Sequence, residues 1–111
     1  MEFRTVTDDY AVSGQIDPAD IEAIKGAGFK SIVCHRPDDE QPGQPSAAAV
    51  GEAAAKAGLG FRHIPIRSGE QVPDGAVSEM RQALDELEGP VFAYCRSGAR
   101  STNIFTMATY G

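Results

Sequence analysis

The sequence predicts an α/β fold with a mainly parallel central sheet and helices on both faces. Short apolar segments typical of buried strands alternate along the chain with segments that have helical spacing and helix-capping residues. Strands separated by helices form βαβ crossovers, which place the strands parallel and the helices on the two faces. No linker, repeat or low-complexity tract interrupts the alternation, so residues 1–111 are expected to form a single domain.

The N-terminal part is expected to contain two short strands and a helix. Residues 3–6 and 10–12 are rich in apolar and β-branched side chains and flank a polar turn. A helix should follow, because Asp17 suits the N-cap and Pro18 suits the first helical position. We expect this helix to end at the glycine-bearing stretch that begins at Gly26.

The rest of the chain alternates regularly between strand, loop and helix signals. The predicted elements are a strand over 31–34, a loop over 35–46, a helix over 47–57, a strand over 61–66, a loop over 67–75, a helix over 77–87, a strand over 90–94 and a helix over 102–110. The carboxyl ends of parallel strands meet at one edge of a sheet, where ligands bind in open α/β folds. The loops over 35–46 and 67–75 should therefore gather there with the loop that follows the last strand.

Composition excludes several classes of function. The chain has 16 acidic and 10 basic residues, a net charge of −6, which argues against binding to nucleic acid or to an anionic membrane surface. No apolar stretch is long enough to span a membrane. The two cysteines are far apart and do not resemble a disulfide framework, so we expect a reducing, cytoplasmic location. No Cys/His spacing fits zinc, and we expect no metal and no other cofactor.

The segment from Tyr94 to Ser101 carries the chemistry. It places Cys95 between a buried strand and a helix, within the reach of loop amides, the helix dipole and Arg100, all of which favour the reactive thiolate. We therefore predict Cys95 and Arg100 as the catalytic residues. The predicted anion-binding residues around them are Arg96, Ser97, Gly98, Ala99 and Ser101, with Arg36 and Arg67 as candidates for the rim.

The spacing within this loop resembles one enzyme class more than another. A cysteine loop followed by Arg-Ser is shared in outline by rhodanese sulfurtransferases and by protein tyrosine and dual-specificity phosphatases. Phosphatases of that kind have five residues between cysteine and arginine, whereas four residues separate Cys95 from Arg100, as in rhodanese. A shorter ring of amides suits a smaller guest, and a sulfane sulfur is smaller than a phosphoryl group.

Outside this loop the chain does not look like rhodanese and instead resembles a small bacterial family. Residues 12–15, 28–33, 36–46 and 63–66 are similar to the phosphatase-like domain of the β-lactamase-hydrolase-like proteins, often described as a sulfur transferase. The resemblance covers nearly the whole chain. It implies a dual-specificity-phosphatase-like scaffold with a rhodanese-like loop. It also implies, as a partner, a persulfide dioxygenase of the metallo-β-lactamase fold, either fused or encoded nearby.

In the dual-specificity phosphatases that this chain resembles, a general-acid aspartate follows the strand that corresponds to residues 63–66. This chain has Arg67 and Ser68 at that point, and neither Glu70 nor Asp74 stands at the expected position. The main hypothesis is therefore a sulfurtransferase. Cys95 would take sulfane sulfur from thiosulfate or a low-molecular-weight persulfide and pass it to a thiol or cyanide. Two alternatives stay open: a cysteine-dependent phosphatase and a non-catalytic anion-binding module.

Other side chains have competing interpretations. Cys34 is either a buried core cysteine, which we favour, or a resolving thiol for Cys95. For His35 and His63 a structural or surface role is favoured over a catalytic one. The acidic stretch that follows Arg36 is either a lid over the site or a solvated loop.

Overall fold

A computed structural model describes residues 2–110 and contains one five-stranded sheet in the order β1-β2-β5-β3-β4. The elements in chain order are β1 (Arg4–Thr7), β2 (Tyr10–Ser13), the 3-10 helix η1 (Pro18–Asp20), α1 (Ile21–Gly26), β3 (Ser31–Cys34), α2 (Ala47–Lys56), β4 (Gly60–His63), α3 (Asp74–Glu86), β5 (Val91–Tyr94) and α4 (Ala99–Tyr110). Strand β1 pairs antiparallel with β2, and the other pairings are parallel. The predicted fold class is confirmed. The first and last residues of the single domain expected over 1–111 lie outside the described range.

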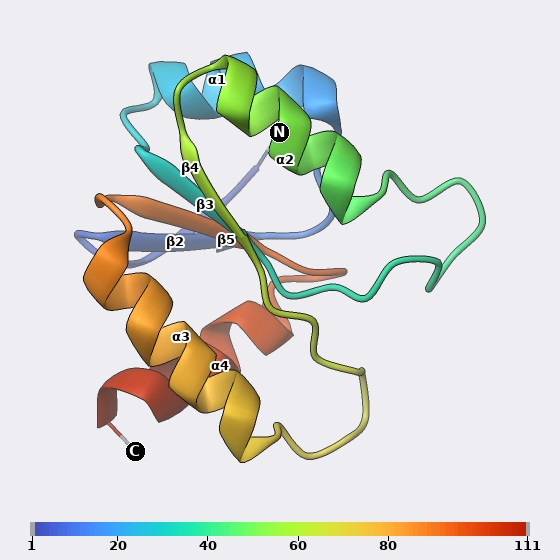
Figure 1. The fold of residues 1–111 in the computed structure, drawn as a ribbon, viewed down its shortest axis with the longest axis vertical. Helices are drawn as coiled ribbons and strands as arrows, with labels where there is room; N and C mark the ends of the chain where they lie inside the picture. Colours follow the sequence, from blue (N-terminus) through green and yellow to red (C-terminus); the bar gives the residue numbers. More distant parts are fainter. Residues whose placement is uncertain (1, 111) are drawn as a thin grey trace.

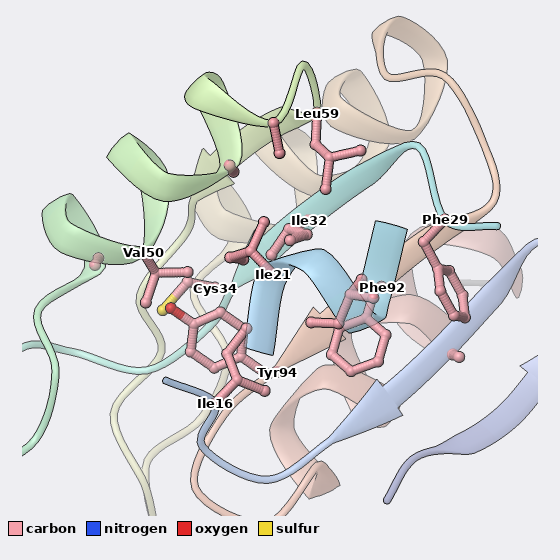
Figure 2. Packing of buried hydrophobic residues seen from close by; sticks show 14 residues of the cluster. Ile16, Ile21, Phe29, Ile32, Cys34, Val50, Leu59, Phe92 and Tyr94 are labelled. Atoms are coloured by element: carbon pink, nitrogen blue, oxygen red, sulfur yellow. The ribbon is translucent and has the colours of Figure 1, made fainter. Parts of the chain in front are cut away.

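Helices cover both faces of this sheet. Helices α1 and α2 lie on one face, and α3 and α4 pack together on the other (Figure 1). Each face has its own apolar cluster. Figure 2 shows the first of them, in which Ile32 and Phe92 from the two central strands meet side chains from α1 and α2, including Ile21 and Val50. Strands β3 and β5 are buried on both sides, as expected of parallel strands in a sheet that helices cover on both faces.

The first helix is shorter than predicted and begins differently. Asp17 is the N-cap, and its side chain accepts a hydrogen bond from the amide of Ala19, while Asp20 reaches back to the Asp17 amide. This capping box closes a 3-10 turn that starts with Pro18, and only then does α1 begin. The expected single helix is therefore two successive short helices.

Other boundaries also differ from the prediction. Helix α3 begins at Asp74, three residues before the helix expected over 77–87 and within the loop expected over 67–75. The strand expected over 61–66 is regular only as β4, although the amides of Ile64 and Ile66 still donate to the carbonyls of Cys34 and His35. The last helix begins at Ala99, three residues earlier than expected, so Arg100 and Ser101 belong to its first turn. No helix among residues 2–110 is long and apolar enough to cross a membrane.

Three parallel strands bring their carboxyl ends together beneath the cysteine loop. The amide of Cys95, directly after β5, donates to the carbonyl of Ser13 at the end of β2 (3.3 Å). On the other side of β5, the amide of His35 donates to the carbonyl of Tyr94 (2.8 Å). The start of the loop is therefore fixed by both neighbouring strands, and His35 is placed under it.

Candidate active site

The Cys95 thiol lies at the bottom of the loop that joins β5 to α4. The residue is 0% exposed, and the Gly98 amide donates to its sulfur at 3.0 Å. Burial raises the pKa of the thiol, but hydrogen bonds from the amides of Ser101, Ser97 and Gly98 and from the Ser101 side chain outweigh burial, so the pKa of Cys95 lies below its ordinary value. The loop is thus built to hold a negative charge at this sulfur.

The loop closes tightly because of Gly98. Its φ of +94° is in the left-handed region, and a Cβ there would lie 3.0 Å from the Arg4 guanidinium and 3.4 Å from the Ser13 carbonyl oxygen. The Ala99 amide, predicted to face a bound anion, instead donates to the Ser97 hydroxyl at 3.3 Å. The amides that meet the sulfur therefore come from Ser97, Gly98 and Ser101, and not from the whole stretch from Arg96 to Ala99.

Arg100 lies between Cys95 and a carboxylate from another loop. Its Nη1 and Nη2 donate to the two Glu40 oxygens at 2.8 and 2.9 Å, and Nη1 also donates to the Ile66 carbonyl at 2.7 Å. The hydrogen bonds to Glu40 raise the pKa of Arg100 despite partial burial, and the charge and hydrogen-bonding capacity of Cys95 act in the same direction. The predicted catalytic pair, Cys95 and Arg100, is thus brought together.

The same carboxylate holds a second arginine. Arg36 Nε donates to Glu40 Oε1 at 2.8 Å, while Nη1 reaches Gln15 and Nη2 reaches Gln41. The prediction of Arg36 as a rim residue is wrong, because its side chain is 3% exposed and all three of its nitrogens donate to neighbouring side chains. We call the group Arg36, Glu40 and Arg100 the arginine–glutamate bridge. It packs the first part of the 35–46 loop against the site, so this part is neither a detached lid nor a fully solvated loop.

Ser101 connects the cysteine to a buried histidine. Its hydroxyl contacts the Cys95 sulfur on one side and His35 Nδ1 on the other, the latter at 2.8 Å. Its backbone carbonyl accepts a hydrogen bond from the buried Tyr10 hydroxyl at 2.8 Å. These contacts fix the first turn of α4 to the sheet below it.

The remaining predicted residues lie farther out. Arg67 is exposed and lines an open cavity of about 400 Å³ together with Glu40 and Glu70, and Arg96 is exposed on the loop itself. Cys34 is buried in the core, where its sulfur lies beside the Tyr94 hydroxyl (Figure 2) and 3.5 Å from the Arg36 carbonyl oxygen. Burial raises the pKa of Cys34, as expected of a core cysteine.

Sequence reasoning included Glu40 only in the candidate lid after Arg36, without its contact to Arg100, and underrated His35. Neither residue is near Cys95 in the chain, and each belongs to the loop after β3. The available signal was the topology, since β3 is adjacent to β5 in a parallel sheet and its loop must then lie over the cysteine. That argument places the loop but does not select which of its acidic residues contacts Arg100.

Comparison with known proteins agrees with this geometry. The family model "Beta-lactamase hydrolase-like protein, phosphatase-like domain" matches residues 2–111. A β-lactamase hydrolase-like protein from Agrobacterium fabrum is 35% identical over 107 residues, which are 96% of this chain and 25% of that protein. The chain thus spans about a quarter of the length of the curated relatives it matches.

Solved structures share the fold. The crystal structure of a putative phosphatase from Neisseria meningitidis is 34% identical, with a TM-score of 0.82, and the match covers 92% of this chain and 72% of that one. The core catalytic domain of the PP-IP phosphatase SIW14 from S. cerevisiae is 16% identical, with a TM-score of 0.64 over 96% of this chain and 72% of that chain, which shows the fold alone. The chain therefore shares its fold with these phosphatases and belongs to the family of β-lactamase hydrolase-like phosphatase-like domains.

Proposed function

We propose that this chain transfers a small group through a covalent intermediate on Cys95, and that the group is sulfane sulfur. The observation that carries the proposal is the short loop, in which four residues separate Cys95 from Arg100 and the Gly98 amide lies 3.0 Å from the sulfur. Such a loop leaves room for one additional atom held by amides more readily than for a tetrahedral phosphoryl group. The lowered pKa of Cys95 supplies the thiolate that attacks.

The reaction balances without an external oxidant or reductant. The Cys95 thiolate attacks the outer sulfur of thiosulfate, the S–S bond of the donor breaks, and sulfite leaves with its electron pair. The product is a Cys95 persulfide whose outer sulfur carries the negative charge. Cyanide or a thiolate then attacks that outer sulfur, and the Cys95 thiolate returns.

The arginine–glutamate bridge supports this choice of group. Hydrogen bonds from Arg100 lower the pKa of Glu40 against partial desolvation, and Arg36 adds to the same effect, so this carboxylate is an anion and not a proton donor at neutral pH. An alcohol leaving from phosphorus needs a general acid. Sulfite and thiolates need much less help from an acid, because their conjugate acids have pKa values far below that of an alcohol.

A second candidate is a cysteine-dependent phosphatase that forms a phosphocysteine intermediate and hydrolyses it. The comparisons favour this candidate over sulfur transfer, because the family is described as phosphatase-like and the solved relatives are phosphatases by name. With Glu40 held as an anion, such an enzyme would act on esters with acidic leaving groups, such as aryl phosphates.

Parallel assays on one preparation separate the candidates. Intact mass after thiosulfate treatment should show one added sulfur on the wild type and none on Cys95→Ser, and cyanide should then release thiocyanate. Hydrolysis of an aryl phosphate is measured beside it. Ester turnover that greatly exceeds sulfur transfer would reverse the assignment. If neither reaction occurs, while thiosulfate or phosphate binds, the chain is an anion-binding module.

The product of the first step suggests the partner. Transfer of the outer sulfur from Cys95 to a small thiol gives a low-molecular-weight persulfide, which can be oxidised. We propose that a persulfide dioxygenase of the metallo-β-lactamase fold receives this small persulfide. The length of the curated relatives leaves room for such a domain in one polypeptide, since the matched region is 25% of the A. fabrum protein. Transfer of labelled sulfur from Cys95 to glutathione, followed by oxygen uptake with the dioxygenase added, would test this step.

A further inference from the structure

His35 is a buried ring whose two nitrogens both have side-chain neighbours. The residue is 0% exposed, Nδ1 lies 2.8 Å from the Ser101 Oγ, and Nε2 lies 3.4 Å from the Met80 sulfur. Burial lowers the pKa of His35 to about 3, and the nearby His63 and Arg100 charges act in the same direction. The imidazole is therefore neutral at physiological pH and carries a single N–H.

The position of this proton decides what Ser101 can do. A thioether has no hydrogen, so it can only accept, and an N–H at Nε2 satisfies the contact with Met80. Nδ1 is then a bare acceptor, and the Ser101 hydroxyl must donate to it. In this arrangement Ser101 turns its lone pairs toward Cys95 and can accept a hydrogen bond from the neutral thiol.

A thiolate at Cys95 requires the opposite direction. The Ser101 hydroxyl must then donate to the sulfur, and the ring must donate from Nδ1 to the Ser101 oxygen, which leaves Nε2 bare against the Met80 thioether. The observed distances around the ring allow either arrangement, because the donor and acceptor roles depend only on the tautomer. The loss at Nε2 is small because a thioether is a weak acceptor. The ring keeps one proton throughout, and the thiol proton leaves to solvent.

We propose that His35 is a positioning residue for Cys95: its tautomer sets the direction of the Ser101 hydroxyl, with the proton on Nε2 beside a neutral thiol and on Nδ1 beside a thiolate. The inference rests on the proposed role of Cys95 as nucleophile. Arg100, Tyr10 and Cys34 are the other charged or titratable groups that act on the sulfur, and His63 and Arg100 are those that act on the ring. They affect the charges of the sulfur and the ring, whereas the Ser101 side chain lies 2.8 Å from the ring and also acts on the sulfur, so it connects the two.

Nitrogen NMR of histidine-labelled protein tests the switch directly. As pH rises through the titration of Cys95, His35 should change from the Nε2–H to the Nδ1–H tautomer, and the change should be missing in Cys95→Ala. His63 is an internal control, because its Nε2 lies 2.9 Å from the Arg36 carbonyl and must stay the donor whenever the ring is neutral. One unchanged His35 tautomer across the titration would overturn the proposal.

A substitution provides a second test that needs no turnover. Met80→Leu is close to volume-conserving and removes the acceptor that favours Nε2–H, so it should lower the pKa of Cys95 by roughly half a unit, the size expected of one weak hydrogen bond. In a Ser101→Ala background the same substitution should have no effect on that pKa. The pKa is read from thiolate absorbance, with Cys95→Ser as the reference. Equal effects in both backgrounds would mean that Met80 acts through packing, and this would exclude the proposed route. Failure of either test leaves the sulfur-transfer assay unaffected, so the two proposals fail separately.

Discussion

Glu40→Gln tests whether the arginine–glutamate bridge holds the site together. In the wild type the carboxylate accepts two hydrogen bonds from Arg100 and one from Arg36, at 2.8 to 2.9 Å. Glutamine keeps the shape but offers one acceptor oxygen, and its amide group would face a guanidinium that can only donate. The substitution therefore removes the countercharge from two arginines at once.

The expected loss of stability follows from how far these groups are buried. The side chains of Arg36, Arg100 and Glu40 are 3%, 12% and 21% exposed, between the limits of a surface pair and a fully buried one. Breaking a surface pair costs about 0–1 kcal/mol and breaking a buried pair about 3–5 kcal/mol, so we expect the free energy of unfolding to fall by about 2 kcal/mol. For a domain of this size that is a decrease in Tm of roughly 10 °C.

The pH dependence of this loss has a definite sign. The pKa of Glu40 is lowered in the folded protein, chiefly by its hydrogen bonds from Arg100. A carboxylate with a depressed pKa contributes stability that is fully present above its unfolded pKa, about 4.3, and is lost as pH falls through the folded value. The difference in stability between wild type and Glu40→Gln should therefore be constant near neutral pH and shrink below about pH 4.3.

Thermal unfolding of both proteins across this pH range checks the reasoning. Glu70→Gln is the matched control, because Glu70 is exposed, lines the same cavity and undergoes the same change of charge. If Glu40→Gln lowers Tm no more than the control at neutral pH, or if its effect grows as pH falls, the bridge does not contribute as argued.

Three further predictions concern the loop. Arg100→Lys keeps the charge but loses the planar fork, and we expect the rate of sulfur loading from thiosulfate to fall about 100-fold, measured by intact mass over time and compared with Arg81→Lys on α3. Gly98→Ala forces a side chain into a left-handed conformation and moves the amide that contacts Cys95, so the thiolate absorbance should titrate at higher pH than in the wild type; an unchanged titration would show that this amide is dispensable. Because the pKa of Cys95 is lowered, the rate of sulfur loading of the wild type should stay high below the ordinary thiol range and decline only as pH falls through the lowered pKa. A pH profile centred on the pKa of an ordinary thiol would show that the loop amides do not stabilise the thiolate.

The fold and the reactive pair could be predicted because their signals are local. Alternating strand and helix patterns give the parallel sheet, and the spacing of Cys95 and Arg100 lies within six consecutive residues. The start of α4 was placed three residues too late because Arg100 and Ser101 were assigned to the loop. The left-handed turn at Gly98 explains the difference, since it lets the helix begin at the next residue.

The supporting contacts could not be predicted because they join residues far apart in the chain. Glu40 and Arg100 are 60 positions apart, and His35 and Ser101 are 66 apart. Several acidic side chains follow Arg36, and the choice of Glu40 over Asp38 depends on where the loop turns. Asp38 accepts a hydrogen bond from the Ala47 amide at the start of α2. This contact turns its carboxylate toward α2, and Glu40 is the residue that binds Arg100.

The contacts of Arg100 limit what can bind beside Cys95. A guanidinium has five N–H groups. Nη1 donates to Glu40 and to the Ile66 carbonyl, and Nη2 donates to Glu40, so three of the five are used. The remaining two, on Nε and Nη2, are what Arg100 can offer toward the loop. A phosphoryl group has several oxygens to satisfy, while a persulfide presents one charged sulfur. An arginine with most of its donors engaged, beside a loop that Gly98 closes tightly, can make few contacts to a guest, and this agrees with the small guest of the proposed sulfur transfer.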